Sequence, residues 1–222
     1  MTDVAAEPGL RERKKQRTRA HVADTARRLF AERGFEQVTI TEIARDAEVA
    51  PATVFNYFPT KEDLFYSRLE AFEEHLLTAI RERPPGQSIL SAFGAFLLDQ
   101  RGVLAMNAPG GDREATSQVQ TITRVITESP ALLARERQVF DQYERHLAEL
   151  IAEGSGAEPG DATCRVVANA LIGLHRALIG HVRELALAGA SAARIRRSVR
   201  SEGERAIARL ERGLGDFGGA PV

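Results

Sequence analysis

A chain of 222 residues with 43% hydrophobic content can bury the core of one ordinary domain, or of a small domain joined to a larger one. Its net charge of −1 does not fit a non-specific architectural DNA protein, which would be basic throughout, and the single cysteine, Cys164, excludes an internal disulfide or a cysteine metal cluster. With neither a secretory signal nor an unbroken apolar run of transmembrane length, the chain is expected to be cytoplasmic, without a part in the membrane.

Positive charge gathers near the N-terminus. Residues 11–19 contain six Lys or Arg and one Glu. We expect residues 1–17 to form a flexible basic arm in which Arg17 meets DNA phosphates or an adjacent groove, with a solvated helix end as the alternative. Thr18 is a candidate N-cap for a first helix that ends near Gly34.

Three helix-start signals follow in close succession. Thr39 with Glu42 three positions later makes a capping box that begins a short helix. After a turn, Pro51 suits the first position of a second helix, which Pro59 ends, and Thr60 caps a third. Two short helices joined by such a turn form a helix-turn-helix, whose second helix is small enough to lie in the DNA major groove.

The stretch around this motif resembles the N-terminal domain of the tetracycline-repressor (TetR) family of transcription regulators. The matching residues are Gly34-Phe35, Thr39, Ile43-Ala44, Thr53, Tyr57-Phe58 and Thr60-Lys61-Glu62. The resemblance is close from about residue 18 to residue 69. It implies an all-α protein that binds double-stranded DNA as a homodimer. Its three-helix DNA-binding domain is expected at 18–62, its ligand-binding and dimerisation domain at 63–216, and a tail at 217–222.

Candidate DNA contacts lie on the second helix of the motif and at two helix starts. The face available to DNA carries Ala50, Pro51, Ala52, Thr53, Asn56 and Tyr57. Asn56 has the donor and acceptor needed to read adenine, with a phosphate contact or solvation as alternatives. The resemblance implies that Tyr57 and Lys61 contact backbone phosphate, and Thr39 is a further phosphate candidate. Phe55 is expected in the core.

Two positions depart from the family pattern. The resemblance implies glycine at the turn position where this chain has Glu48, so the turn is expected to be strained or differently shaped. The second helix opens with small apolar residues, Ala50 to Ala52, which cannot form bidentate hydrogen bonds with guanine. We therefore expect recognition to depend more on thymine methyl groups and on DNA shape.

The rest of the chain also shows helical periodicity. Helices are expected over residues 61–81, 88–101, 113–128, 129–153, 161–188 and 192–214, with a looser patch at 107–112. No stretch shows sustained strand alternation. The whole chain is therefore predicted to be helical.

Two long apolar seams near the C-terminus predict a dimer. The dimerisation candidates are Val167, Leu171, Leu174, Leu178, Val182, Leu185, Ile195, Val199 and Leu210. Ordinary core packing must account for half of each seam, and a four-helix bundle between two chains would account for the rest. A two-fold dimer presents two recognition helices one DNA turn apart, so the operator is expected to be palindromic.

The resemblance also implies a pocket for a small-molecule effector. The candidates for its wall are Phe93, Phe96, Gln100, Met106, Ile122, Val125, Ile126, Phe140, Tyr143, Asn169 and His175. Plain core packing is the alternative for each apolar member, and a side-chain partner for each polar one. The mixture predicts a mainly apolar ligand, and the family's usual direction is that the ligand releases DNA.

An enzyme and a transcriptional activator are the alternatives to a repressor. The five histidines are dispersed, and no catalytic or phosphate-binding motif is present, so neither an enzyme nor a metal or other cofactor is expected. A transcriptional activator of the same architecture remains open, because the sign of regulation depends on where the operator lies.

Overall fold

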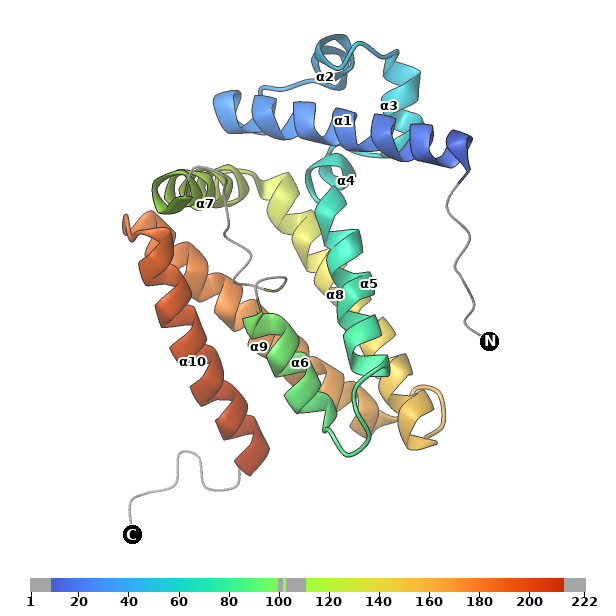
Figure 1. Cartoon of the computed structure of the whole chain (residues 1–222), viewed down its shortest axis with the longest axis vertical. Helices are drawn as coiled ribbons and strands as arrows, with labels where there is room; N and C mark the ends of the chain where they lie inside the picture. Colours follow the sequence, from blue (N-terminus) through green and yellow to red (C-terminus); the bar gives the residue numbers. More distant parts are fainter. Residues whose placement is uncertain (1–8, 100–101, 103–110, 214–222) are drawn as a thin grey trace. The chain divides into compact units, whose positions relative to one another are not determined.

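The computed structural model describes residues 9–99, 102 and 111–213, and its elements are all helices within those ranges (Figure 1). The all-α expectation is confirmed. The chain divides into two compact units, Met1–Leu69 and Glu70–Val222. The helices of the first unit are α1 (Leu10–Arg33), α2 (Ile40–Asp46), α3 (Pro51–Tyr57) and α4 (Lys61–Phe65). Helix α5 (Ser67–Arg81) begins in the first unit and continues along the chain into the second.

In the first unit, α1 packs against α2 and α4, and α2 packs against α3 (Figure 1). Apolar residues from all of these helices and from the α1–α2 connection form one small core. Its fully buried side chains include Val22, Ala26, Phe30, Phe35, Val38, Ile43, Val54, Phe58 and Leu64. Such a core explains why the two short helices keep their relative positions, because helices of seven residues are not stable by themselves.

Helix α1 begins earlier than the sequence signals predict. It starts at Leu10, so Arg17 is helical and the expectation of a flexible arm up to residue 17 is wrong for residues 10–17. The segment is rich in Arg, Lys, Glu and Gln, which are good helix formers, and it contains neither Gly nor Pro. Thr18 lies inside the helix, where its hydroxyl donates to the carbonyl of Lys14 (3.1 Å) instead of capping.

The expected long helix over residues 61–81 is interrupted once. It forms as α4 and α5, separated by Tyr66, where ψ is 11° and the regular helical backbone is broken. The other predicted helices are confirmed with small shifts at their ends. They are α6 (Ile89–Leu98), α7 (Gly111–Thr127), α8 (Pro130–Ser155), α9 (Ala162–Leu187) and α10 (Ala192–Arg212).

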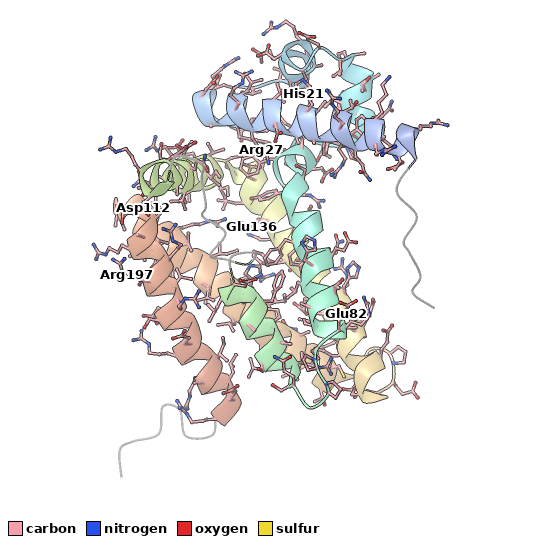
Figure 2. The ribbon with its side chains drawn as sticks, in the orientation of Figure 1. His21, Arg27, Glu82, Asp112, Glu136 and Arg197 are labelled. Carbon is pink, nitrogen blue, oxygen red and sulfur yellow. The ribbon has the colours of Figure 1, made fainter. Side chains whose placement is uncertain are left out.

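Helix α9 is central in the second unit, where it packs against α6, α7, α8 and α10. Glu136 on α8, labelled in Figure 2, accepts two hydrogen bonds from the guanidinium of Arg183 on α9. Helices α6 and α10 approach closely because Gly203 has no side chain. A Cβ there would lie 2.6 Å from Leu98. Van der Waals packing and ion pairs, among them the partly buried Arg183–Glu136 pair, therefore join the helices of this unit.

Helix α9 is long and apolar enough to cross a membrane by length and composition alone, with a mean hydropathy of 1.2. The core helix of a soluble protein passes the same test. Its contacts with four other helices, and the Arg183–Glu136 ion pair, fit a core helix.

Candidate functional site

A reciprocal cap at Thr39 holds the first helix of the motif. The Thr39 hydroxyl accepts from the N–H of Glu42 (3.2 Å), and Oε2 of Glu42 accepts from the Thr39 N–H (2.9 Å) and hydroxyl (2.8 Å). The Thr39 bonds, with an ion pair from Arg33 (2.9 Å), lower the pKa of Glu42 to about 2. The predicted capping box is confirmed, and the Thr39 hydroxyl is already engaged in it.

The turn between α2 and α3 contains a strained residue. Glu48 has a φ of +54°, the left-handed region that favours glycine, and no other non-glycine residue in the described ranges has a positive φ. Hydrogen bonds from the N–H of Glu48 to Arg45 (3.1 Å) and from the N–H of Val49 to Ala44 (2.9 Å) close this turn. The strain expected from glutamate at this position is therefore present.

Helix α3 presents a mostly apolar outer face. Ala50, Pro51, Ala52 and Asn56 are exposed, and Thr53 and Tyr57 are half-buried. The expectation that Phe55 lies in the core is wrong, because 52% of its surface is exposed. A seven-residue helix buries only a narrow face, here Val54 and Phe58, and Phe55 is turned by about 100° from Val54.

Phe55 is thus a candidate DNA contact that the apolar spacing alone did not reveal. It lies three positions after Ala52 and next to Asn56, so the three side chains share one outward face. The signal that could have identified it is the shortness of α3, bounded by Pro51 and Pro59.

The two basic candidates lie in different surroundings. Arg17 is exposed on α1. The ammonium of Lys61 is 2.9 Å from the carbonyl oxygen of Phe35, 3.1 Å from that of Val38, and 4.1 Å from the centroid of the Phe35 ring. All of these residues belong to the first unit.

In the second unit, a cluster of aromatic rings surrounds a buried histidine. We call Phe72, Phe96, Phe140, Tyr143 and His175 the aromatic cluster. The ring of His175 stacks on Phe72 (centroids 5.0 Å apart) and meets Phe140 edge-on (5.2 Å). Burial lowers the pKa of His175 to about 3, so the ring is neutral near pH 7. Its Nδ1 has no hydrogen-bond partner among the described residues.

Several pocket candidates are buried and others are not. Phe93, Phe96, Val125, Ile126, Phe140, Tyr143 and His175 are buried. Ile122 is 50% exposed, and Asn169 is exposed, its amide donating to Glu144 (2.6 Å), so the place of these two residues in a pocket wall stays a prediction. Periodicity on α7 and α9 marks an apolar side but does not show how wide the buried stripe is. Gln100 and Met106 lie outside the described residues.

Most of the predicted dimer seam belongs to the core of the single chain. The buried members are Leu171, Leu174, Leu178, Ile195 and Val199, and the half-buried ones are Val182, Leu185 and Leu210. The five buried residues pack within their own chain, as core packing of part of each seam requires, and the dimer contact stays a prediction. Val167 is 36% exposed.

Another face of α9 is open. Val166 is 67% exposed, and Ala170, Gly173 and Ala177 follow it at helical spacing, all of them exposed. A Cβ at Gly173 would meet nothing within 4 Å. We call these four residues the small-residue face of α9.

Models of known protein families match segments in both units of this chain. Residues 22–67 match the profile of bacterial regulatory proteins of the tetR family, and residues 101–215 match that of the MftR C-terminal domain. The regulator TcmR of Streptomyces glaucescens is 34% identical over 157 residues, which cover 69% of this chain and 67% of TcmR. The putative mycofactocin biosynthesis regulator MftR of Mycobacterium tuberculosis is 25% identical over 169 residues, covering 73% and 78%.

Solved structures show the same fold. NalD of Pseudomonas aeruginosa, described as the secondary repressor of the MexAB-OprM multidrug efflux pump, superposes with a TM-score of 0.54 at 20% identity, covering 87% of this chain and 96% of NalD. FadR of Bacillus subtilis, solved in complex with stearoyl-CoA, has a TM-score of 0.50 at 21% identity, covering 83% and 96%.

Proposed function

This chain belongs to the TetR family of bacterial regulatory proteins, and from that premise we propose that it is a homodimeric repressor released from a palindromic operator by a small, mainly apolar ligand. The family match and the relatives identify the chain as a DNA-binding transcriptional regulator, and proteins of that class are not enzymes. The observation that carries the proposal is the exposed face of α3 on the buried core of the first unit, since a recognition helix must be rigid and open to the groove. Its place of action would be the cytoplasm, with the operator DNA.

The chemistry of α3 favours a particular kind of recognition. Ala52 and Phe55 offer apolar surface suited to thymine methyl groups, and Asn56 offers the paired donor and acceptor that adenine presents. No arginine or lysine lies on this helix to read guanine. We therefore propose A·T-rich half-sites, with Arg17 and Tyr57 contacting phosphates at their edges.

The small-residue face of α9 supports a dimer. Small side chains let two helices approach closely, and the exposed Val166 would gain burial in such a contact. A Gly173→Arg substitution tests this, because the added side chain has free space in one chain but would block a partner helix. We expect a monomer by analytical ultracentrifugation, whereas Ala134→Arg at an exposed site of α8 should remain a dimer. A dimeric Gly173→Arg variant would place the interface elsewhere.

The aromatic cluster supports an effector site in the second unit. Aromatic rings suit an apolar ligand, and the unpaired Nδ1 of His175 is a buried polar atom that a ligand could satisfy. A ligand that binds the DNA-free conformation more tightly would lower DNA affinity, and DNA would lower ligand affinity by the same factor.

Selection of duplexes from a random DNA library by the purified protein tests the central claim. We expect an enriched palindrome whose half-site centres are about one helical turn apart. Asn56→Ala should relax the preference at one position in each half-site, and Tyr57→Ala should weaken binding to all sequences. Salt-sensitive binding without any enriched motif would refute sequence-specific recognition. An enriched site without two-fold symmetry would refute the dimeric mode.

A further inference from the structure

The imidazole of His175 is packed between rings that offer its Nδ1 no hydrogen-bond partner. Phe72 stacks on it with 23° between the ring planes, and Phe140 meets it edge-on at 85°. Neither phenylalanine carries a polar side-chain atom, and Nδ1 is buried without a partner among the described residues. Buried polar atoms are hydrogen-bonded in most proteins, so this unpaired atom indicates a partner that the chain itself does not supply.

A hydroxyl group on a ligand fits this position better than a trapped water molecule. A buried water needs about two to four polar partners, and the two phenylalanine rings packed on His175 add none to Nδ1. A ligand hydroxyl needs fewer, because the rest of the ligand is held by apolar contact. A neutral imidazole has one N–H and one lone pair, and a hydroxyl can both donate and accept, so it satisfies Nδ1 in either tautomer.

The arrangement of the rings favours a flat ligand. Phe72 is nearly parallel to Tyr143 (18°) as well as to His175, whereas Phe140 stands edge-on to both of them. Stacked and edge-on contacts are the arrangements in which aromatic rings attract one another, and an alkyl chain lacks the ring quadrupole behind them. Phe72 is half-buried and the other four members of the aromatic cluster are buried, so a ligand ring would enter on the side of Phe72.

The electrostatics favour an uncharged ligand. Burial lowers the pKa of His175 to about 3, so the imidazole brings no positive charge to the site near pH 7. A charged ligand group beside it would lose its hydration without gaining an opposite charge.

We propose that the aromatic cluster binds a flat, uncharged aromatic compound that carries a hydroxyl group, with its ring among the aromatic side chains and its hydroxyl on Nδ1 of His175. This names the ligand class of the effector site proposed above, and it rests on that function for its effect on DNA. The binding itself is a property of the DNA-free protein.

Two compounds that differ by one oxygen atom, 1-naphthol and naphthalene, test the hydroxyl. Equilibrium dialysis against the full-length protein measures both affinities through the fluorescence of the compounds, and the chain contributes no tryptophan emission because it contains no tryptophan. We expect 1-naphthol to bind about tenfold more tightly, from the hydrogen bond to Nδ1. Equal affinities, tighter binding of naphthalene, or no binding of either compound would overturn the proposal.

Two histidine variants locate the preference. His175→Phe keeps a ring in the cluster and removes the unpaired nitrogen, so it should fold and lose the preference for 1-naphthol. His181→Phe is the matched control on the same helix, because His181 already has a partner in Ser198 (2.8 Å). It should keep the preference. A preference that survives in His175→Phe would overturn the assignment to Nδ1.

The compound 1-octanol, which has a hydroxyl but no ring, tests the aromatic part. We expect it to displace 1-naphthol only weakly at equal concentration. If 1-octanol competes more strongly than unlabelled 1-naphthol, the site prefers an alkyl chain and the proposed ligand class is wrong.

Two further results separate the remaining outcomes. If His175→Phe does not fold, a crystal structure of the wild-type protein with 1-naphthol decides: an oxygen within about 3.2 Å of Nδ1 supports the proposal, and one placed elsewhere overturns it. If 1-naphthol binds through His175 but leaves operator affinity unchanged, the ligand class stands and the effector role in the proposed function fails.

Discussion

Replacing Glu48 by glycine should stabilise the DNA-binding unit. Glu48 has a φ of +54°, and its side chain is exposed, so the substitution removes backbone strain without exposing any core. The left-handed conformation costs an L-residue about 1–2 kcal/mol. Glycine gains more freedom in the unfolded chain, which costs about 0.4–1 kcal/mol. The difference predicts a gain near 0.8 kcal/mol.

Calorimetry of the full-length chain measures this gain. For a unit of this size, about 0.8 kcal/mol corresponds to a rise in Tm of roughly 3–6 °C in the transition of the DNA-binding unit. Slower amide hydrogen exchange in residues 40–58 would identify the unit that is stabilised.

Glu48→Ala is the matched control, because it removes the same charge but keeps the Cβ. We expect no gain from alanine. An equal rise in Tm for the alanine and glycine variants would refute the strain argument and assign the effect to the loss of negative charge. A fall in Tm for glycine alone would mean that the unfolded-chain entropy outweighs the strain.

Three further predictions concern pH and specificity. The Thr39 hydrogen bonds and Arg33 hold the pKa of Glu42 near 2, below its usual 4.5, so its stabilising effect is complete above about pH 5 and is lost as the pH falls towards 2. Denaturant titrations should show that Glu42→Gln removes this loss, and an unchanged pH profile would contradict the cause given. Burial lowers the pKa of His175 from 6.5 to about 3, so the unfolded chain binds a proton that the folded chain does not, and stability should fall from about pH 6.5 towards pH 3 by up to about 1.4 kcal/mol per pH unit. His175→Phe should flatten that decline; an equally steep decline would assign it to other groups. Finally, uracil in place of operator thymine should weaken binding of the wild type but not of Phe55→Ala, and equal losses in both would remove Phe55 from the thymine contact.

The helix-turn-helix could be predicted from the sequence because its signals act over short distances. The capping boxes at Thr39 and Thr60 each join residues three positions apart, and Pro51 and Pro59 act on their immediate neighbours. Such interactions depend little on the rest of the fold. The unusual turn at Glu48 could also be predicted from the sequence, because the family resemblance implies glycine at that position.

Which face of each helix is buried by its own chain was harder to predict from the sequence. Apolar spacing located α9 and α10, but it could not divide their residues between the core of one chain and a partner chain. Leu171 and Ile195 are buried by their own chain, whereas the small-residue face, with Val166 exposed, is open. The width of a buried stripe depends on how many neighbouring helices pack around it, which is a property of the tertiary structure.

Sequence by itself therefore determined the all-α class, the motif and its caps. The hydrogen bonds of a cap join residues within one helical turn, so residues close together in the sequence are enough to predict them. The tertiary structure alone decided that Phe55 is exposed and that Lys61 turns inward. Lys61 contacts residues 26 and 23 positions earlier in the chain. Contacts across such separations exist only after the helices have packed, so no local pattern predicts them.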